Sequence, residues 1–200
     1  MDQTQSDHLK AYGIAYWTLN QGQNVDWLLN FRGGSFLVNY DNSIEWELKL
    51  RGIYYEFVDA GLLTEIFATI EENNMDMVLL EKLPKIAVYS PPGKQPWDDA
   101  VTLALTYAEI NYDVVFDDEV LSDKLKDYDW LHLHHEDFTG QYGKFYKNYH
   151  NASWYKNMEI QFQETALKHG FNSVHELKKK VALKIKEYVI NGGFMFAMCS

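Results

Sequence analysis

The chain has 200 residues, of which 46% are hydrophobic and 16% aromatic, enough for one substantial α/β domain or for a domain with a smaller appendage. Its formal net charge of −11 disfavours nucleic acid and anionic membrane surfaces as partners, because excess carboxylates repel phosphates. A single cysteine excludes an internal disulfide, and the chain shows neither a signal peptide nor an apolar run long enough to predict a membrane span.

The first predicted elements form an N-terminal α/β segment that we expect to span residues 1–84. Apolar residues at helical spacing predict helices, and short runs of β-branched and aromatic residues predict strands. Asp41 or Ser43 is a candidate cap for the second helix. The predicted helices cover residues 8–20, 62–72 and a stretch ending at 50, and the predicted strands cover 25–29, 35–38 and 53–58.

The turn Arg32-Gly33-Gly34-Ser35 has two interpretations. Glycine frees backbone N–H groups and arginine makes bidentate contacts, so the turn could hold an anion. It lacks the strand-to-helix context of a phosphate-binding loop. We therefore favour a hairpin turn with a structural arginine.

The second predicted segment covers residues 85–200 and alternates strands with helices. Such alternation predicts parallel β-α-β units, hence a parallel sheet with helices on both faces. Within it, Lys178-Lys179-Lys180 is interpreted as the solvated face of a helix. The predicted strands cover 85–90, 112–116, 129–134 and 194–198, the helices cover 98–110, 121–125 and 174–190, and residues 140–172 are interpreted as an insertion.

Ligands of open parallel sheets bind beyond the carboxyl ends of the strands. Here that rule selects residues 90–94, 117–119, 134–143 and Cys199. Asp117-Asp118-Glu119 either binds a cation or caps the following helix, and capping is the commoner use of such residues.

Cys199 follows a predicted strand, where a nucleophile elbow would place its thiol. Ala197 supplies the small residue that such a tight corner needs. A following helix N-terminus would favour the thiolate, which is the reactive form. The alternative is that Cys199 is a small buried hydrophobe that ends a strand.

The densest group of potential metal ligands lies at the end of the strand predicted over 129–134. It consists of three histidines and two acidic residues: His132, His134, His135, Glu136 and Asp137. His132 and His134 share one face of that strand, but no spacing matches a strong zinc signature, so no metal and no cofactor is predicted. A metal-dependent hydrolase using His132, His134 and Glu136 is a weaker alternative. The candidate pocket residues beside the thiol are His134, His135, Glu136, Asp137 and Tyr142.

Residues 85–200 resemble the class I glutamine amidotransferase-like superfamily, which has a flavodoxin-like sheet and a cysteine on an elbow. The resemblance rests on KIAVYS, KDYDWLHLHHED and IKEYVINGGFMFAMCS. The superfamily elbow usually reads Gly-x-Cys-x-Gly, and here Ala197 takes the first glycine position. The resemblance implies that Cys199 attacks glutamine or another carboxamide.

The whole chain resembles a family of Bacteroidetes proteins labelled asparagine synthetase B. HLKAYGIAYWTL, VDWLLNFRGGSFLV, KQPWDDAVTLALTYAEI and DWLHLHHEDFTGQYGKFY carry this resemblance. The label itself has no support in the residues, since the chain starts Met1-Asp2 and has no Ser-Gly-Gly-x-Asp-Ser loop. Family members are longer, with an apolar leader typical of the cell envelope. The resemblance thus implies a fragment, cut after the nucleophile strand and inactive alone.

The sequence thus favours a cysteine-dependent amidohydrolase or amidotransferase on a flavodoxin-like sheet. The alternative is a non-catalytic carbohydrate-binding or envelope-associated module on the same fold, because aromatic side chains stack on sugars.

Overall fold

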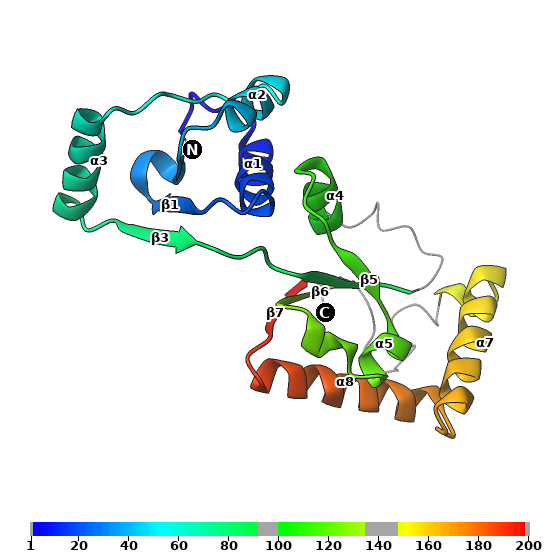
Figure 1. Cartoon of the computed structure of the whole chain (residues 1–200). Coiled ribbons are helices and arrows are strands. Elements are labelled where there is room, and N and C mark those ends of the chain that lie inside the picture. The colour runs from blue at the N-terminus through cyan, green and yellow to red at the C-terminus, as the bar shows by residue number, and fades with distance from the viewer. Residues whose placement is uncertain (1, 92–99, 135–147, 199–200) are drawn as a thin grey trace. The chain divides into compact units, whose positions relative to one another are not determined.

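The structure is a computed structural model that describes residues 2–91, 100–134 and 148–198 (Figure 1). It is a mixed α/β protein containing a four-stranded, all-parallel sheet flanked by helices, consistent with a flavodoxin-like fold. The chain forms two compact units, one of Met1–Leu83 with Ala100–Asn111 and one of Pro84–Asp99 with Tyr112–Ser200.

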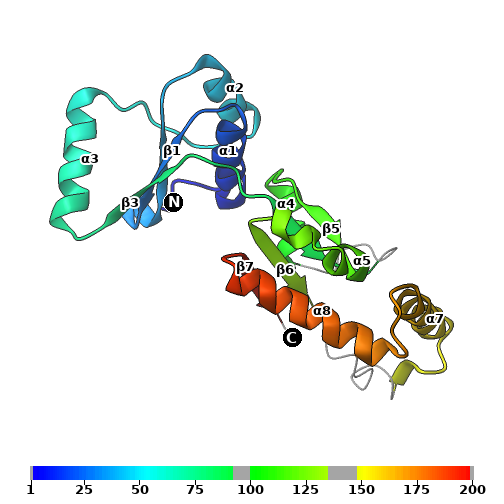
Figure 2. The same cartoon turned by 60° about the horizontal axis from the view of Figure 1, so that its bottom comes forward.

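The first unit contains a three-stranded antiparallel sheet with strand order β2-β1-β3. Trp27 of β1 contacts Tyr12 of α1, whereas its neighbour Leu28 packs with Ile66 and Ile70 of α3. Successive strand side chains point to opposite faces, so α1 and α3 contact β1 through neighbouring residues of opposite orientation, and Figure 2 shows the two helices on either side of β1. The elements are α1 (His8–Asn20), β1 (Val25–Leu29), η1 (Phe31–Gly33), β2 (Ser35–Val38), α2 (Asn42–Leu50), α3 (Ala60–Glu72), β3 (Asp76–Leu80) and α4 (Ala100–Tyr107).

The third strand of this sheet is not the predicted one. Residues 53–58 form no strand, and β3 pairs with β1 instead. The backbone of the predicted strand has other partners: Ile53 N–H donates to the Leu48 carbonyl at the end of α2, and Gln5 Nε2 donates to the Tyr54 carbonyl. Burial of the Ile53 side chain beside α1 fixes the segment there.

Helix α4 follows β4 in sequence but belongs to the first unit. A methyl group on Gly13 of α1 would lie 2.0 Å from the carbonyl oxygen of Ala108, directly after α4. Lys10 Nζ also lies 2.7 Å from Glu109 Oε1. Glycine therefore permits α1 and the end of α4 to approach closely, and an ion pair crosses the same contact.

The second unit contains the parallel sheet, with strand order β5-β4-β6-β7. Every neighbouring pair is parallel, as the alternating pattern predicts. The elements are β4 (Ile86–Tyr89), β5 (Asp113–Val115), α5 (Asp117–Leu121), η3 (Lys124–Asp127), β6 (Trp130–His134), α7 (Ser153–Lys168), α8 (Val174–Ile190) and β7 (Phe194–Met198).

One hydrophobic core joins this sheet to α5, α7 and α8. Leu131 and Leu133 of β6 point into it from the same sheet face as Ala87 of β4, with which Leu131 is in register. The segment that we interpreted as an insertion contains α7, which contributes Phe162 and Ala166 to this core. The helices therefore hold one face of the sheet in a fixed position.

Candidate functional site

The carboxyl ends of the four parallel strands form the edge where open α/β sheets bind ligands. Tyr89 ends β4 and lies in register with both Val115 of β5 and Leu133 of β6. His134 ends β6 and lies in register with Met198, the last residue of β7. The strand order reverses direction between β4 and β6, so this edge includes the switch point of the sheet.

The predicted site residues follow these strand ends. His134 occupies the last position of β6, and β7 ends one residue before Cys199. Cys199 itself lies outside the described residues. So do His135, Glu136, Asp137 and Tyr142.

The described part of the edge contains a buried cluster of three polar side chains. Lys178 Nζ of α8 lies 2.7 Å from Asp117 Oδ2 and 2.9 Å from Asp117 Oδ1. It also donates to the Tyr89 hydroxyl at 3.0 Å, and that hydroxyl donates to Asp117 Oδ1. The side chains of Asp117 and Lys178 are 0% and 4% exposed, so solvent does not screen this ion pair.

Aromatic rings surround the ammonium group of this cluster. Lys178 Nζ lies 4.3 Å from the ring centre of Phe116 and 4.5 Å from that of Phe162. A cation over an aromatic face is attracted by the ring quadrupole, most strongly where water is excluded. The cluster thus connects the end of β4, the start of α5 and the second turn of α8.

Our interpretation of Lys178 as a solvated side chain is wrong. Lys178 lies on the buried stripe of α8, next to Leu177 and one turn before Val181. The signal was its helical spacing from those apolar residues, which places it on the core face. The run of three lysines concealed this, because Lys179 at the next position is exposed.

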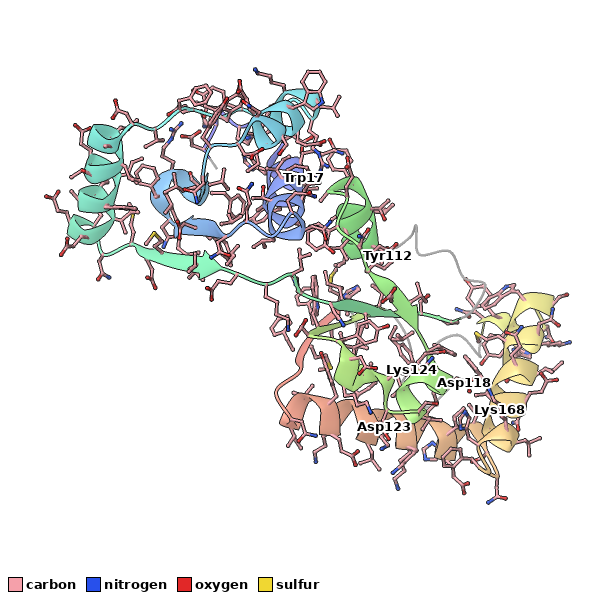
Figure 3. The ribbon with its side chains drawn as sticks, viewed as in Figure 1. Trp17, Tyr112, Asp118, Asp123, Lys124 and Lys168 are labelled. Carbon is pink, nitrogen blue, oxygen red and sulfur yellow. The ribbon has the colours of Figure 1, made fainter. Side chains whose placement is uncertain are left out.

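Carboxylates in the first turn of α5 are bonded to other groups of the protein. Glu119 accepts a hydrogen bond from the Phe116 backbone N–H at 3.0 Å, so it caps a helix as predicted. That helix is α5, which begins at Asp117 and not at residue 121 as we predicted. Asp118 lies 2.6 Å from Lys168 Nζ and 2.6 Å from His169 Nε2. Figure 3 labels Asp118 of α5 beside Lys168 of α7. The Lys168 hydrogen bond, followed by that of His169, holds the pKa of Asp118 below its usual value. These carboxylates also disfavour a phosphate at the end of β5.

His132 is buried on β6 and stacks on Phe196 of β7, with ring centres 5.8 Å apart. Within the described ranges, no group of three or more His, Cys, Asp or Glu side chains is placed to hold a metal ion. Glu136, a member of the alternative metal site, lies outside these ranges.

The turn at Arg32 is a hairpin, as we predicted. Strands β1 and β2 pair on either side of it, and Arg32 forms ion pairs with Asp2 and Glu56. Arg32 is therefore a structural residue that joins the hairpin to two other segments of the first unit.

Comparisons of the chain with protein-family models, with curated proteins and with solved structures found no match. In the part of the chain that the structure describes, no helix has the length and apolar character needed to cross a bilayer.

Proposed function

We propose that the chain is a class I glutamine amidotransferase-like protein in which Cys199 is the nucleophile for amide hydrolysis or amido transfer. The observation that carries this proposal is the end of β7 at Met198, in register with His134 on the neighbouring parallel strand. A residue following that strand end belongs to the edge that binds ligands in open α/β sheets.

The proposed reaction proceeds through a thioester. The Cys199 thiolate attacks the carboxamide carbon, a C–S bond forms, the leaving nitrogen takes up a proton, and the C–N bond breaks with release of ammonia. Water then cleaves the C–S bond and releases the acyl group as a carboxylic acid, while in amido transfer the ammonia passes to a second substrate. His134, His135, Glu136, Asp137 and Tyr142 are the residues that we propose for the pocket around the carboxamide.

The buried Tyr89–Asp117–Lys178 cluster supports the proposal as a positioning element. It fixes the end of β4 to α5 and α8 by charged hydrogen bonds that solvent does not reach. A reacting group at the same edge needs a rigid support, because small displacements lower the rate steeply.

The test is the alkylation rate of Cys199 by iodoacetamide as a function of pH, measured on the full-length protein. Mass spectrometry of the peptide that contains Cys199 assigns the alkylated thiol. We expect a thiol pKa well below the usual value of about 8.5. We also expect glutamine, but not glutamate, to slow the reaction, because only glutamine carries the carboxamide that the thiolate attacks.

The control is Cys199→Ser, which must show no alkylation of this peptide. An alkylation rate that follows an ordinary thiol and ignores glutamine would make Cys199 a packing residue and would refute the proposal.

A further inference from the structure

A cavity of about 350 Å³ lies within the first unit, remote in sequence from the proposed cysteine site. It is within the size range of small-ligand pockets. Residues 2–66 of the first unit supply all of its lining. A ligand of this cavity would thus contact residues of the first unit alone.

The floor of the cavity is apolar. Buried side chains of α1, β1 and α2 form it: Ala11, Ile14, Ala15, Leu28 and Ile44. A polyol placed there would leave hydroxyl groups without partners, which is costly. An apolar or aromatic ligand body, in contrast, would gain from leaving water.

The rim of the cavity carries an excess of carboxylates. Among the charged side chains that line it, one is a guanidinium, that of Arg32, and four are carboxylates: Asp2, Asp41, Glu45 and Glu56. A cationic ligand is attracted by this excess, and an anionic ligand is repelled.

Arg32 compensates part of this charge but offers no free donor to an anion, because its guanidinium is directed at protein acceptors. Its Nε lies 2.7 Å from Asp2 Oδ2, and its two terminal nitrogens lie 3.1 Å from Glu56 Oε2 and 3.3 Å from Thr4 Oγ1. An anion at this place would have to displace a carboxylate. The Tyr54 hydroxyl donates to the second oxygen of Glu56, so the carboxylate is held at the rim in one orientation.

Aromatic rings also line the cavity. Phe57 lies between Tyr40 and Tyr55, with ring centres 5.7 Å and 5.6 Å apart. The hydroxyls of both tyrosines donate to Glu45, whose carboxylate is also paired with Lys49 Nζ. Ring faces near the rim carboxylates suit an organic ammonium group.

We propose that this cavity binds small amphiphilic organic amines, with the apolar body on the floor and the ammonium group at the carboxylate rim. This inference is independent of the function proposed for Cys199.

The test compares four small probes by isothermal titration calorimetry at low ionic strength. The probes are 2-phenylethylamine, the neutral 2-phenylethanol, the anionic 3-phenylpropionate, and methyl glucoside. We expect the amine to bind at least tenfold more tightly than the alcohol, and we expect the anion and the sugar not to bind. Added salt should weaken binding of the amine but not of the alcohol.

Glu56→Gln removes one rim charge while keeping an oxygen acceptor for Tyr54. It should weaken binding of the amine about tenfold and leave the alcohol unchanged, since a hydrogen bond to a charged partner is the stronger kind. The matched control is Glu65→Gln, the same change at an exposed position of α3 that does not line the cavity.

Equal affinity for the amine and the alcohol would overturn the proposal, as would binding of none of the probes. Tighter binding of the glucoside would overturn it in favour of a carbohydrate site. The probe series on the unmodified chain decides the question even where a variant does not fold.

Discussion

At the scale of single residues, Lys178 is the most informative side chain of the second unit. A lysine is rarely buried unless a carboxylate compensates for its lost hydration. Here Asp117 supplies the charge and Tyr89 a third hydrogen-bonding group. Because both charges are buried, the pair is costly to break but has a small net effect when both partners are replaced together.

Lys178→Met should therefore lower the free energy of unfolding by about 3–5 kcal/mol, since it leaves the Asp117 carboxylate buried without its cation. Urea unfolding measures this loss. The matched control is Lys179→Met, which changes an exposed neighbour and should shift stability by at most about 0.5 kcal/mol. Equal losses for the two variants would mean that the buried pair does not stabilise the fold.

The double variant Asp117→Leu/Lys178→Met separates the charge from the packing. Without either charge, most of the loss caused by Lys178→Met should be recovered. Additive losses in the double variant would contradict this account and would assign the effect to lost packing volume.

At the scale of elements, periodic patterns predicted most helices and strands. Residues 8–20 and 174–190 repeat apolar side chains at helical spacing, and both are helices with the predicted bounds. Residues 53–58 alternate like a strand, yet their backbone groups bond to α2 and to Gln5. Strand pairing depends on a partner far along the chain, so the local pattern could not choose between this segment and β3.

The close approach of α1 to the end of α4 yields a test at the same scale. Gly13→Ala should lower the free energy of unfolding by about 1–3 kcal/mol, because the added methyl group would overlap the Ala108 carbonyl and force the helices apart. Thermal unfolding of the chain measures the effect.

Gly61→Ala is the matched control on α3. There the nearest atom to a new methyl group is Asp59 Oδ1, on a side chain, at 3.3 Å. Alanine favours a helix over glycine, so this change should be neutral or slightly stabilising. A Gly13→Ala variant as stable as Gly61→Ala would show that α1 and the end of α4 do not pack this closely.

At the scale of the whole molecule, the order of strands and helices was sufficient to predict the parallel sheet. It was not sufficient to assign α4, because contact with α1 places that helix in the first unit. The buried polar cluster could not be predicted either, because Tyr89, Asp117 and Lys178 come from three segments that are far apart in the sequence. Only the folded chain brings such residues together.

The acidic composition leads to a prediction for the whole chain. Lowering the pH from 7 towards the sequence pI of about 5.0 removes part of the net charge of −11, which relieves self-repulsion. Further acidification should destabilise the fold, because hydrogen bonds and ion pairs lower the pKa values of carboxyls such as Asp7, Glu109 and Asp118. We expect stability, measured by urea unfolding, to pass through a maximum between about pH 5 and 6.

Asp118→Asn tests the sign of this effect. The pKa of Asp118 is lower in the folded chain than its usual value, so the native state binds fewer protons than the unfolded state. The contribution of Asp118 to the free energy of unfolding is therefore fully present above the usual carboxyl pKa of about 4, and it is lost as the pH falls through the lowered pKa. Because the side chain is 42% exposed, the variant should lose less than about 1 kcal/mol at pH 7. The difference in free energy of unfolding between the variant and the unmodified chain should vanish below the lowered pKa. A difference that stays constant over the whole pH range would instead indicate a loss of packing.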